Sequence, residues 1–282
     1  MGVDTHVLRL LLESQKSGLS FSSTIMIGRQ NYWGLNVSDL CNALNIKSED
    51  ASALLEQKYI ESLLRRLGAT KIESIDNSAY EQASIIHDLN EPIPEYLKTS
   101  FSCVFDGGAI EHIFNFPQAI KNCMEMVAVG GHFLGVTAAN NFMGHGFYQF
   151  SPELYYRVFS SENGYAIEAM LLCETDRGSP WYRVEDPGSL GRRVELINKR
   201  PTYIMVIARR LSDAAIFKTT PQQSDYMTAW GLNTRPEVSE SRRASSIKSG
   251  VSKVLPRALK SSLKRMANGR SEAFQSDAYR RV

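Results

Sequence analysis

Short apolar segments, each stopped by a glycine or an aspartate, recur through the first half of the chain. They alternate with stretches in which apolar residues fall at helical spacing. Such apolar runs are typical of strands that are buried on both faces, as in a parallel sheet covered by helices. We predict strands of this kind at residues 24–27, 71–75, 83–86, 101–105 and 132–137.

Two later apolar segments, 165–173 and 202–209, are separated by a polar stretch without a clear helical pattern. We therefore expect them to form an antiparallel pair at one edge of the sheet. The predicted fold class is α/β and Rossmann-like: a mostly parallel seven-stranded sheet with helices on both faces and an antiparallel edge strand.

The connection into the third predicted strand is unusually short. Seven residues separate Asp76 from Ser84, whereas a parallel crossover normally needs a dozen or more. Either this crossover is a single turn, or the third strand pairs differently.

Helical patterns occupy residues 4–16, 36–45, 49–67 and 109–127. A further helix is expected to begin at Ser151-Pro152-Glu153, because serine is a preferred N-cap and proline suits the first helical position. We expect an N-terminal helix (1–20), a main domain (21–212), a polar linker (213–250) and a basic amphipathic tail (251–282).

The positive charge of the chain is concentrated near its C-terminal end. Residues 236–282 carry a net charge of +7, and the other residues carry −5. The apolar residues of 251–266 fall on one helical face, which suits an anionic membrane surface or a protein partner. A solvated tail is the alternative. Nucleic acid is not an expected partner, because the body is acidic and the tail lacks interleaved aromatic residues.

A cytoplasmic location is expected, with peripheral attachment at the inner membrane face if the tail binds lipid. The four cysteines form no CxxC pair, the first residues do not resemble a signal peptide, and no apolar run approaches ~20 residues. We expect no metal site. His132, His145 and nearby aspartates are the candidate ligands, but they do not occur at ligand spacing.

Polar residues follow the predicted strands at their carboxyl ends, where open parallel sheets bind ligands. One carboxylate can accept both ribose hydroxyls of a nucleoside, and a second can accept from an exocyclic amine. The alternative is that these aspartates serve turns and helix N-caps. The residues at these ends are Gly28-Arg29-Gln30, Asp76, Asp88, Asp106-Gly107-Gly108 and Thr137.

The segment SCVFDGGAIEHIFNFPQAIKNCMEMVAVGGHFLGV, which starts at Ser102, resembles a class I S-adenosylmethionine (SAM) methyltransferase. It is similar to that family's fourth strand, the EH pair of the following helix, and the GG turn into the fifth strand. The resemblance covers roughly residues 22–210 and implies SAM as cofactor. It implies that Asp76 binds the ribose of the cofactor and that Asp88 binds the adenine amine. It also implies that the backbone around Gly28, with Arg29 and Gln30, approaches the methionine moiety. Asp106 and Gly107 would border the transferred methyl group.

The first-strand loop departs from the family pattern. Met26 replaces the usual acid, Gln30 and Tyr32 stand where small residues are expected, and Ser102 replaces an aspartate in the fourth strand. Two hypotheses follow. The first is SAM-dependent methyl transfer to a small-molecule or glycan-like acceptor. The second is an inactive methyltransferase-like binding module, anchored by its basic tail.

The segment 140–150 follows the fifth predicted strand and is rich in glycine, asparagine and aromatic residues. His145 is the candidate general base, since its reference pKa of about 6.5 allows it to take a proton near neutrality. Tyr148 and Gln149 are the candidate acceptor-binding residues. Alternatively, this loop packs over the sheet edge, with His145 merely hydrogen-bonded. Arg29 likewise has an alternative role, a salt bridge to a strand-end acid.

Overall fold

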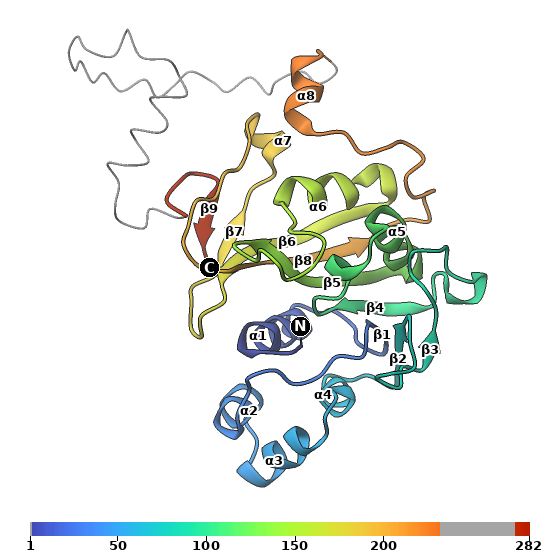
Figure 1. Cartoon of the computed structure of the whole chain (residues 1–282), viewed down its shortest axis with the longest axis vertical. Helices are drawn as coiled ribbons and strands as arrows, with labels where there is room; N and C mark the ends of the chain where they lie inside the picture. Colours follow the sequence, from blue (N-terminus) through green and yellow to red (C-terminus); the bar gives the residue numbers. More distant parts are fainter. Residues whose placement is uncertain (1, 232–273) are drawn as a thin grey trace, which may run out of the picture.

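The structure is a computed structural model that describes residues 2–231 and 274–282. In these residues the strands are β1 (Ser23–Ile27), β2 (Lys71–Asp76), β3 (Ile85–Ile86), β4 (Phe101–Asp106), β5 (Val127–Asn140), β6 (Tyr165–Glu174), β7 (Tyr182–Val184), β8 (Thr202–Arg210) and β9 (Tyr279–Arg281). They form one sheet in the order β3-β2-β1-β4-β5-β8-β6-β7-β9 (Figure 1).

The half of the sheet from β3 to β5 is parallel, and the half from β8 to β9 is antiparallel. This confirms the predicted Rossmann-like fold class and the antiparallel pairing of β6 with β8. The strand count differs from the seven expected, because β7 and β9 extend the sheet beyond β6. Both are three residues long, which is too short for the apolar pattern to reveal them.

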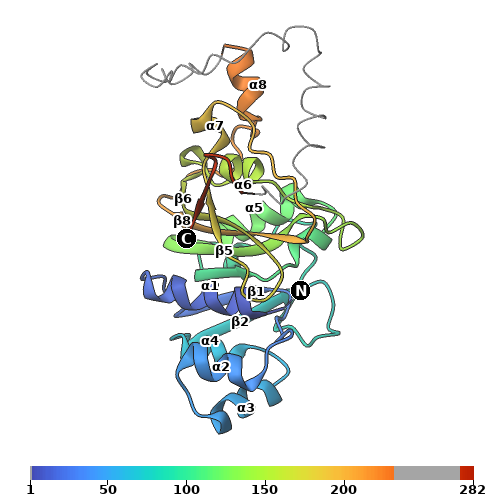
Figure 2. The ribbon, with the colours of Figure 1, turned by 90° about the vertical axis from the view of Figure 1, so that its left-hand side faces the viewer.

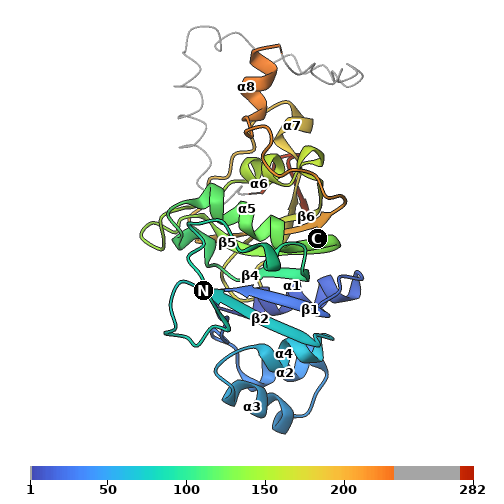
Figure 3. The ribbon, with the colours of Figure 1, turned by 90° about the vertical axis from the view of Figure 1, so that its right-hand side faces the viewer.

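Helices cover both faces of the sheet, as predicted. They are α1 (Thr5–Lys16), α2 (Val37–Leu44), α3 (Ser48–Glu56), α4 (Glu61–Arg66), α5 (Phe116–Met126), α6 (Pro152–Val158), α7 (Pro187–Leu190) and α8 (Ser224–Ala229), with 3₁₀ turns η1 (Glu95–Leu97), η2 (Ile110–His112) and η3 (Ser161–Asn163). Figures 2 and 3 show α2, α3 and α4 gathered at one end of the molecule and α8 at the opposite end.

Alternate residues of the central strands supply two separate cores. In β8, Ile204 and Val206 face the core that contains α5 and α6, whereas Tyr203 and Met205 face the core that contains α1. Successive side chains of a strand point to opposite faces. A strand buried on both faces is therefore apolar along its length, which is why the sequence shows runs here and not alternation.

The short crossover into β3 is a series of turns, and β3 is parallel to β2 after all. Only Ile85 and Ile86 pair with the end of β2. Ser84 takes the place of further strand pairing: its hydroxyl accepts from the Ser74 backbone N–H at 2.8 Å, and its own N–H donates to the Ser74 hydroxyl at 3.1 Å. Because β3 is so short, a full crossover helix is not required.

The helix predicted at 49–67 is wrong as a single element, because α3 and α4 are separated by residues 57–60. At this break the Ile60 N–H donates to the Gln30 carbonyl oxygen at 3.1 Å, and Tyr59 pairs with Asn31. Tertiary contacts with the loop after β1 thus replace helical hydrogen bonds.

The helix predicted at 109–127 is also divided, into η2 and α5, with Pro117 in the first turn of α5. Proline fits the first turn of a helix and not its interior. The predicted start at Ser151 is confirmed, since its side chain caps α6 by accepting from the Leu154 N–H.

The segment expected to be a polar linker contains α8, and the end of the expected tail contains β9. Strand β9 pairs with β7, so the last residues of the chain belong to the sheet. The amphipathic segment 251–266 lies outside the described residues, and its membrane or protein partner stays a prediction. In the part of the chain that the structure describes, every helix is too short or too polar to cross a bilayer.

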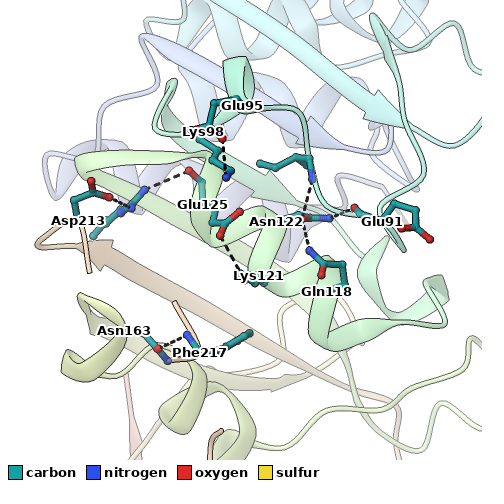
Figure 4. Close-up of polar contacts among 12 residues, drawn as sticks. Glu91, Glu95, Lys98, Gln118, Lys121, Asn122, Glu125, Asn163, Asp213 and Phe217 are labelled. Carbon is teal, nitrogen blue, oxygen red and sulfur yellow. Dashed lines mark hydrogen bonds and ion pairs between the residues drawn. The ribbon is translucent and has the colours of Figure 1, made fainter. Parts of the chain in front are cut away.

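Asn122 of α5 fixes the segment that follows β3 (Figure 4). Its amide nitrogen donates to the carbonyl oxygens of Leu89 and Glu91 at 3.0 and 2.8 Å, and its oxygen accepts from the Ile93 N–H at 3.2 Å. Asn122 is fully buried. One helix residue therefore holds in place the segment that carries Asp88.

Candidate functional site

A cavity of about 350 Å³ lies at the carboxyl ends of β1 and β2, between the segments that follow β1, β2, β3 and β4. It brings together five of the residues that the sequence singled out: Gly28, Arg29, Gln30, Asp76 and Asp88. The strand order reverses between β1 and β4. Open α/β sheets bind their ligands beyond the carboxyl ends of the strands at such a point. The other lining residues are Ile27, Ile75, Asn77, Glu81, His87, Leu89, Asn90, Gly108, Ala109, His112 and Ile113.

Asp76 and Gly28 form one wall of this pocket. Gly28 has a φ of +65°, and a Cβ at this position would lie 3.8 Å from Asp76 Oδ2. Asp76 Oδ1 accepts from the Ser78 N–H at 3.0 Å. Oδ2 has no hydrogen-bond partner among the described residues, so one carboxylate oxygen remains to receive a ligand's hydroxyl.

Asp88 is held by its own loop. Its Oδ1 accepts from the Asn90 N–H at 2.9 Å and from the Asn90 side-chain amide at 2.7 Å. These two hydrogen bonds hold the pKa of Asp88 below its usual value. Asp88 is therefore a carboxylate at neutral pH, able to accept from an amine donor.

Arg29 lines the pocket but directs its guanidinium away toward α4. Its Nε lies 2.7 Å from Glu61 Oε1, and the guanidinium stacks on the Tyr59 ring at 3.9 Å from the centroid. It also donates to the carbonyl oxygen of Glu81 at 3.2 Å. Arg29 thus ties α4 to the loop after β2. Glu61 belongs to α4, whereas the alternative hypothesis for Arg29 was a salt bridge to an acidic residue at a strand end.

The bulky Gln30 is folded under the loop. Its amide nitrogen donates to the Ile27 carbonyl oxygen at 2.7 Å, and the amide occupies the space where Gly107 would otherwise carry a Cβ. Gly107 does not line the pocket. Its lack of a side chain makes room for Gln30.

Asp106 does not line the pocket either. It is completely buried at the end of β4, where Oδ1 accepts from the Ala109 N–H at 2.8 Å and Oδ2 has no partner among the described residues. Burial raises the pKa of Asp106 above its usual value. Gly108 and Ala109 border the pocket in its place, because the chain turns outward after β4.

The other two departures from the family pattern lie away from the pocket. Met26 is completely buried in the core beneath α1. The Ser102 hydroxyl accepts from the Ser23 N–H at 3.0 Å near the start of β4. Neither residue obstructs the cavity.

His145 lies beside a buried acidic residue, Glu111, to which the sequence pattern gives no role. Its Nε2 is 3.5 Å from Oε1 of Glu111, whose side chain is fully buried. Neither oxygen of Glu111 has a hydrogen-bond partner among the described residues. Burial, followed by the charge of Asp106, raises the pKa of Glu111 above its usual value, and burial lowers the pKa of His145.

His112 joins this cluster from the pocket side. Its ring lies 5.0 Å from that of His145, centroid to centroid, and it is also part of the pocket wall. The ligand atoms of Glu111, His112 and His145 lie within 4.8 Å of one another. The three residues could hold a metal ion, whereas the sequence pattern predicts none.

Tyr148 and Gln149 use their polar groups within the loop. The Tyr148 hydroxyl donates to the Phe114 carbonyl oxygen at 2.6 Å, and Gln149 Oε1 accepts from the Phe142 N–H at 2.8 Å. Neither residue lines the pocket. The structure gives both of them a role in closing the loop over η2.

The sequence carried one signal for Glu111. It is a charged residue that follows the apolar Ala109 and Ile110, close to the start of an amphipathic helix. A charge within an apolar environment marks a buried ionisable group. That it meets His145 depends on the fold, because 33 residues separate the two along the chain.

No protein-family model and no curated protein match the chain. Similar solved structures include the branched-chain polyamine synthase of Thermus thermophilus, at 14% identity over 77% of this chain with a TM-score of 0.40. This chain spans 59% of the length of that synthase. A geranyl diphosphate methyltransferase solved with SAM shares 11% identity over 73% of this chain and 85% of its own, with a TM-score of 0.40.

An N-methyltransferase from Bradyrhizobium japonicum shares 12% identity over 72% of this chain and 94% of its own, with a TM-score of 0.39. Methyltransferases are thus among the solved structures to which the chain is similar. At these identities the function has to be argued from the residues of the pocket.

Proposed function

We propose that this chain is a SAM-dependent methyltransferase that acts on a small-molecule or glycan-like acceptor. The observation that carries the proposal is the pocket itself, which is lined by the polar residues that follow three separate strands. Its volume of about 350 Å³ lies within the range of roughly 300–1,000 Å³ for small-molecule sites.

The residues present fit a nucleoside cofactor. Asp76 offers an unpaired carboxylate oxygen to the ribose, and Gly28 lets the cofactor approach the backbone closely. Asp88 offers a carboxylate to the adenine amine, and Ala109 and Ile113 supply apolar contact. Bound SAM would supply an activated methyl group, so the chain's task is to orient the two reactants.

On the acceptor side, His145 is the proposed general base. Burial lowers its pKa, so the imidazole is neutral and able to accept a proton near pH 7. Glu111 Oε1, 3.5 Å from Nε2, would hold the imidazole ring in position. The glycan-like acceptor is the finer part of the proposal and is supported by the resemblance alone.

The alternative of an inactive module depends on bulky side chains filling the cofactor site. Gln30 is folded under the loop, and Tyr32 packs against the core beneath α1, where burial raises its pKa to about 12. The cavity beside them stays open. These positions favour the catalytic hypothesis.

Calorimetric titration with SAM and with S-adenosylhomocysteine tests the proposal. We expect micromolar binding by the native chain. The Asp76→Ala variant should bind at least about tenfold more weakly, because a charge-assisted hydrogen bond contributes ~1.5–3 kcal/mol and 1.4 kcal/mol is a factor of ten.

Glu73→Ala is the matched control, since Glu73 belongs to the same strand but does not line the pocket. Equal affinity of native and Asp76→Ala chains would exclude the ribose role of Asp76. Lack of binding at millimolar ligand by a folded chain would exclude the methyltransferase assignment.

A further inference from the structure

The three-residue cluster beside the pocket has the composition of a metal site that keeps an open coordination position. Glu111 and His112 come from the single turn η2, and His145 comes from the loop after β5. Two imidazoles and one carboxylate form the protein ligand set of several catalytic zinc sites and of non-haem iron sites. We propose that Glu111, His112 and His145 bind one divalent transition-metal ion of the Zn²⁺ class.

The spacing of the donor atoms suits such an ion. Zinc lies about 2.0–2.2 Å from imidazole nitrogen and carboxylate oxygen, so neighbouring ligands of a tetrahedral ion are roughly 3.4 Å apart. His145 Nε2 and Glu111 Oε1 are separated by 3.5 Å. His112 is the exposed member of the three, so its ring is able to turn toward the ion.

Three polar atoms of the cluster have no hydrogen-bond partner in the described part of the chain, and a bound metal ion would coordinate them. Glu111 is fully buried, and both of its carboxylate oxygens and His145 Nε2 have no hydrogen-bond partner among the described residues. Buried polar atoms are nearly always paired, so these atoms are available to a bound ion.

Backbone contacts hold the ligands in position. The N–H groups of Phe147 and Tyr148 donate to the Glu111 carbonyl oxygen at 2.9 and 3.2 Å, so the loop is fastened directly to η2. A Cβ on Gly146 would lie 3.1 Å from His112 Nδ1. The glycine therefore allows the loop to approach both neighbouring ligands closely. Glu111 and the loop that carries His145 are therefore held close together before an ion binds.

An ion here would lie between the proposed cofactor pocket, of which His112 is a wall, and the loop after β5. Its open position would bind an acceptor oxygen and lower the pKa of that hydroxyl, as metal ions do for water. His145 would then be a ligand of the ion and not the base. Metal binding itself does not depend on the proposed function.

Titration of the metal-free full chain with Co²⁺, followed by displacement with Zn²⁺, tests the proposal without SAM. We expect one equivalent of Co²⁺ to give visible d–d absorption that Zn²⁺ abolishes. Glu111→Gln and His145→Gln should weaken binding at least about 100-fold, because the loss of a second-shell partner alone costs 10–100-fold. His87→Gln is the control, since His87 lines the pocket outside the cluster.

Two results would overturn the proposal: no binding of either metal at micromolar concentration, or equal affinity in the native chain and both ligand variants. Glu111→Gln preserves the shape of the side chain, so a folded variant is expected, and near-UV circular dichroism would verify it. Because SAM is absent, failure of metal binding leaves the cofactor assignment standing, and failure of SAM binding leaves the metal site standing.

Discussion

The lack of a side chain at Gly107 leaves the space that the Gln30 amide occupies beneath the pocket. A Cβ there would overlap the Gln30 amide and lie 3.3 Å from the Phe105 ring. Gly107→Ala should therefore destabilise the chain by about 1–3 kcal/mol, the usual cost of overpacking. Urea unfolding measures the effect.

A double-mutant cycle identifies the cause. If the collision is with Gln30, the variant that combines Gly107→Ala with Gln30→Ala should be less destabilised than the sum of the two single variants. Additive losses would mean that the added methyl group collides with the Phe105 ring instead.

His132 of β5 should make stability depend on pH. It is buried, and burial lowers its pKa below the usual value, although Glu168, 3.2 Å away, opposes this. As the pH falls, His132 is therefore protonated at a higher pH in the unfolded chain than in the folded chain. The stability contributed by neutral His132 is complete above its unfolded pKa of about 6.5 and is lost as the pH falls below it.

The free energy of unfolding in urea, measured between about pH 7.5 and pH 5.5, checks this effect. The His132→Gln variant should lose less stability over that range than the native chain. An identical pH dependence of both proteins would show that the burial of His132 does not contribute.

At the scale of elements, one residue of α5 fixes the backbone of the segment that follows β3. Asn122 satisfies backbone groups of Leu89, Glu91 and Ile93 while it is itself buried. Asn122→Ala should cost roughly 3 kcal/mol, because it leaves buried backbone groups unpaired at ~1–3 kcal/mol each.

The neighbouring residue on the same helix provides the control for Asn122. Lys121 is partly exposed and pairs only loosely with Glu125, at 3.8 Å. Lys121→Ala should change the free energy of unfolding by less than about 0.5 kcal/mol. Equal effects of the two substitutions in thermal or urea unfolding would contradict the role of Asn122.

For the whole molecule, the sheet joins residues from both ends of the chain. Ala278 is completely buried next to β9, and its carbonyl oxygen accepts from the Glu185 N–H at 3.1 Å. Ala278→Asp should release β9 and cost at least about 2 kcal/mol, because it buries an unpaired charge. Ser276→Asp, at an exposed position, should have little effect.

Limited proteolysis with mass spectrometry measures this release. The Ala278→Asp chain should be trimmed at its C-terminal end faster than the Ser276→Asp chain. Equal rates of trimming would mean that β9 contributes nothing to the stability of the sheet.

The sequence by itself determined the parallel half of the sheet and the pocket at its edge. Strands buried on both faces must be apolar throughout, so the runs ending at Gly28 and Asp76 were visible without a structure. The carboxyl ends of parallel strands lie at one edge, so polar residues that follow such runs must converge there. The apolar composition of a strand and the polar residue that follows it can both be read from a short segment of the sequence.

Only the tertiary structure decided the rest. The division of the helix at 49–67, the inward fold of Gln30, the addition of β9 and the meeting of Glu111 with His145 all depend on contacts between residues distant along the chain. Local pattern cannot specify such contacts, since they arise when packed elements exclude water and leave each polar group with whichever partner the fold brings near.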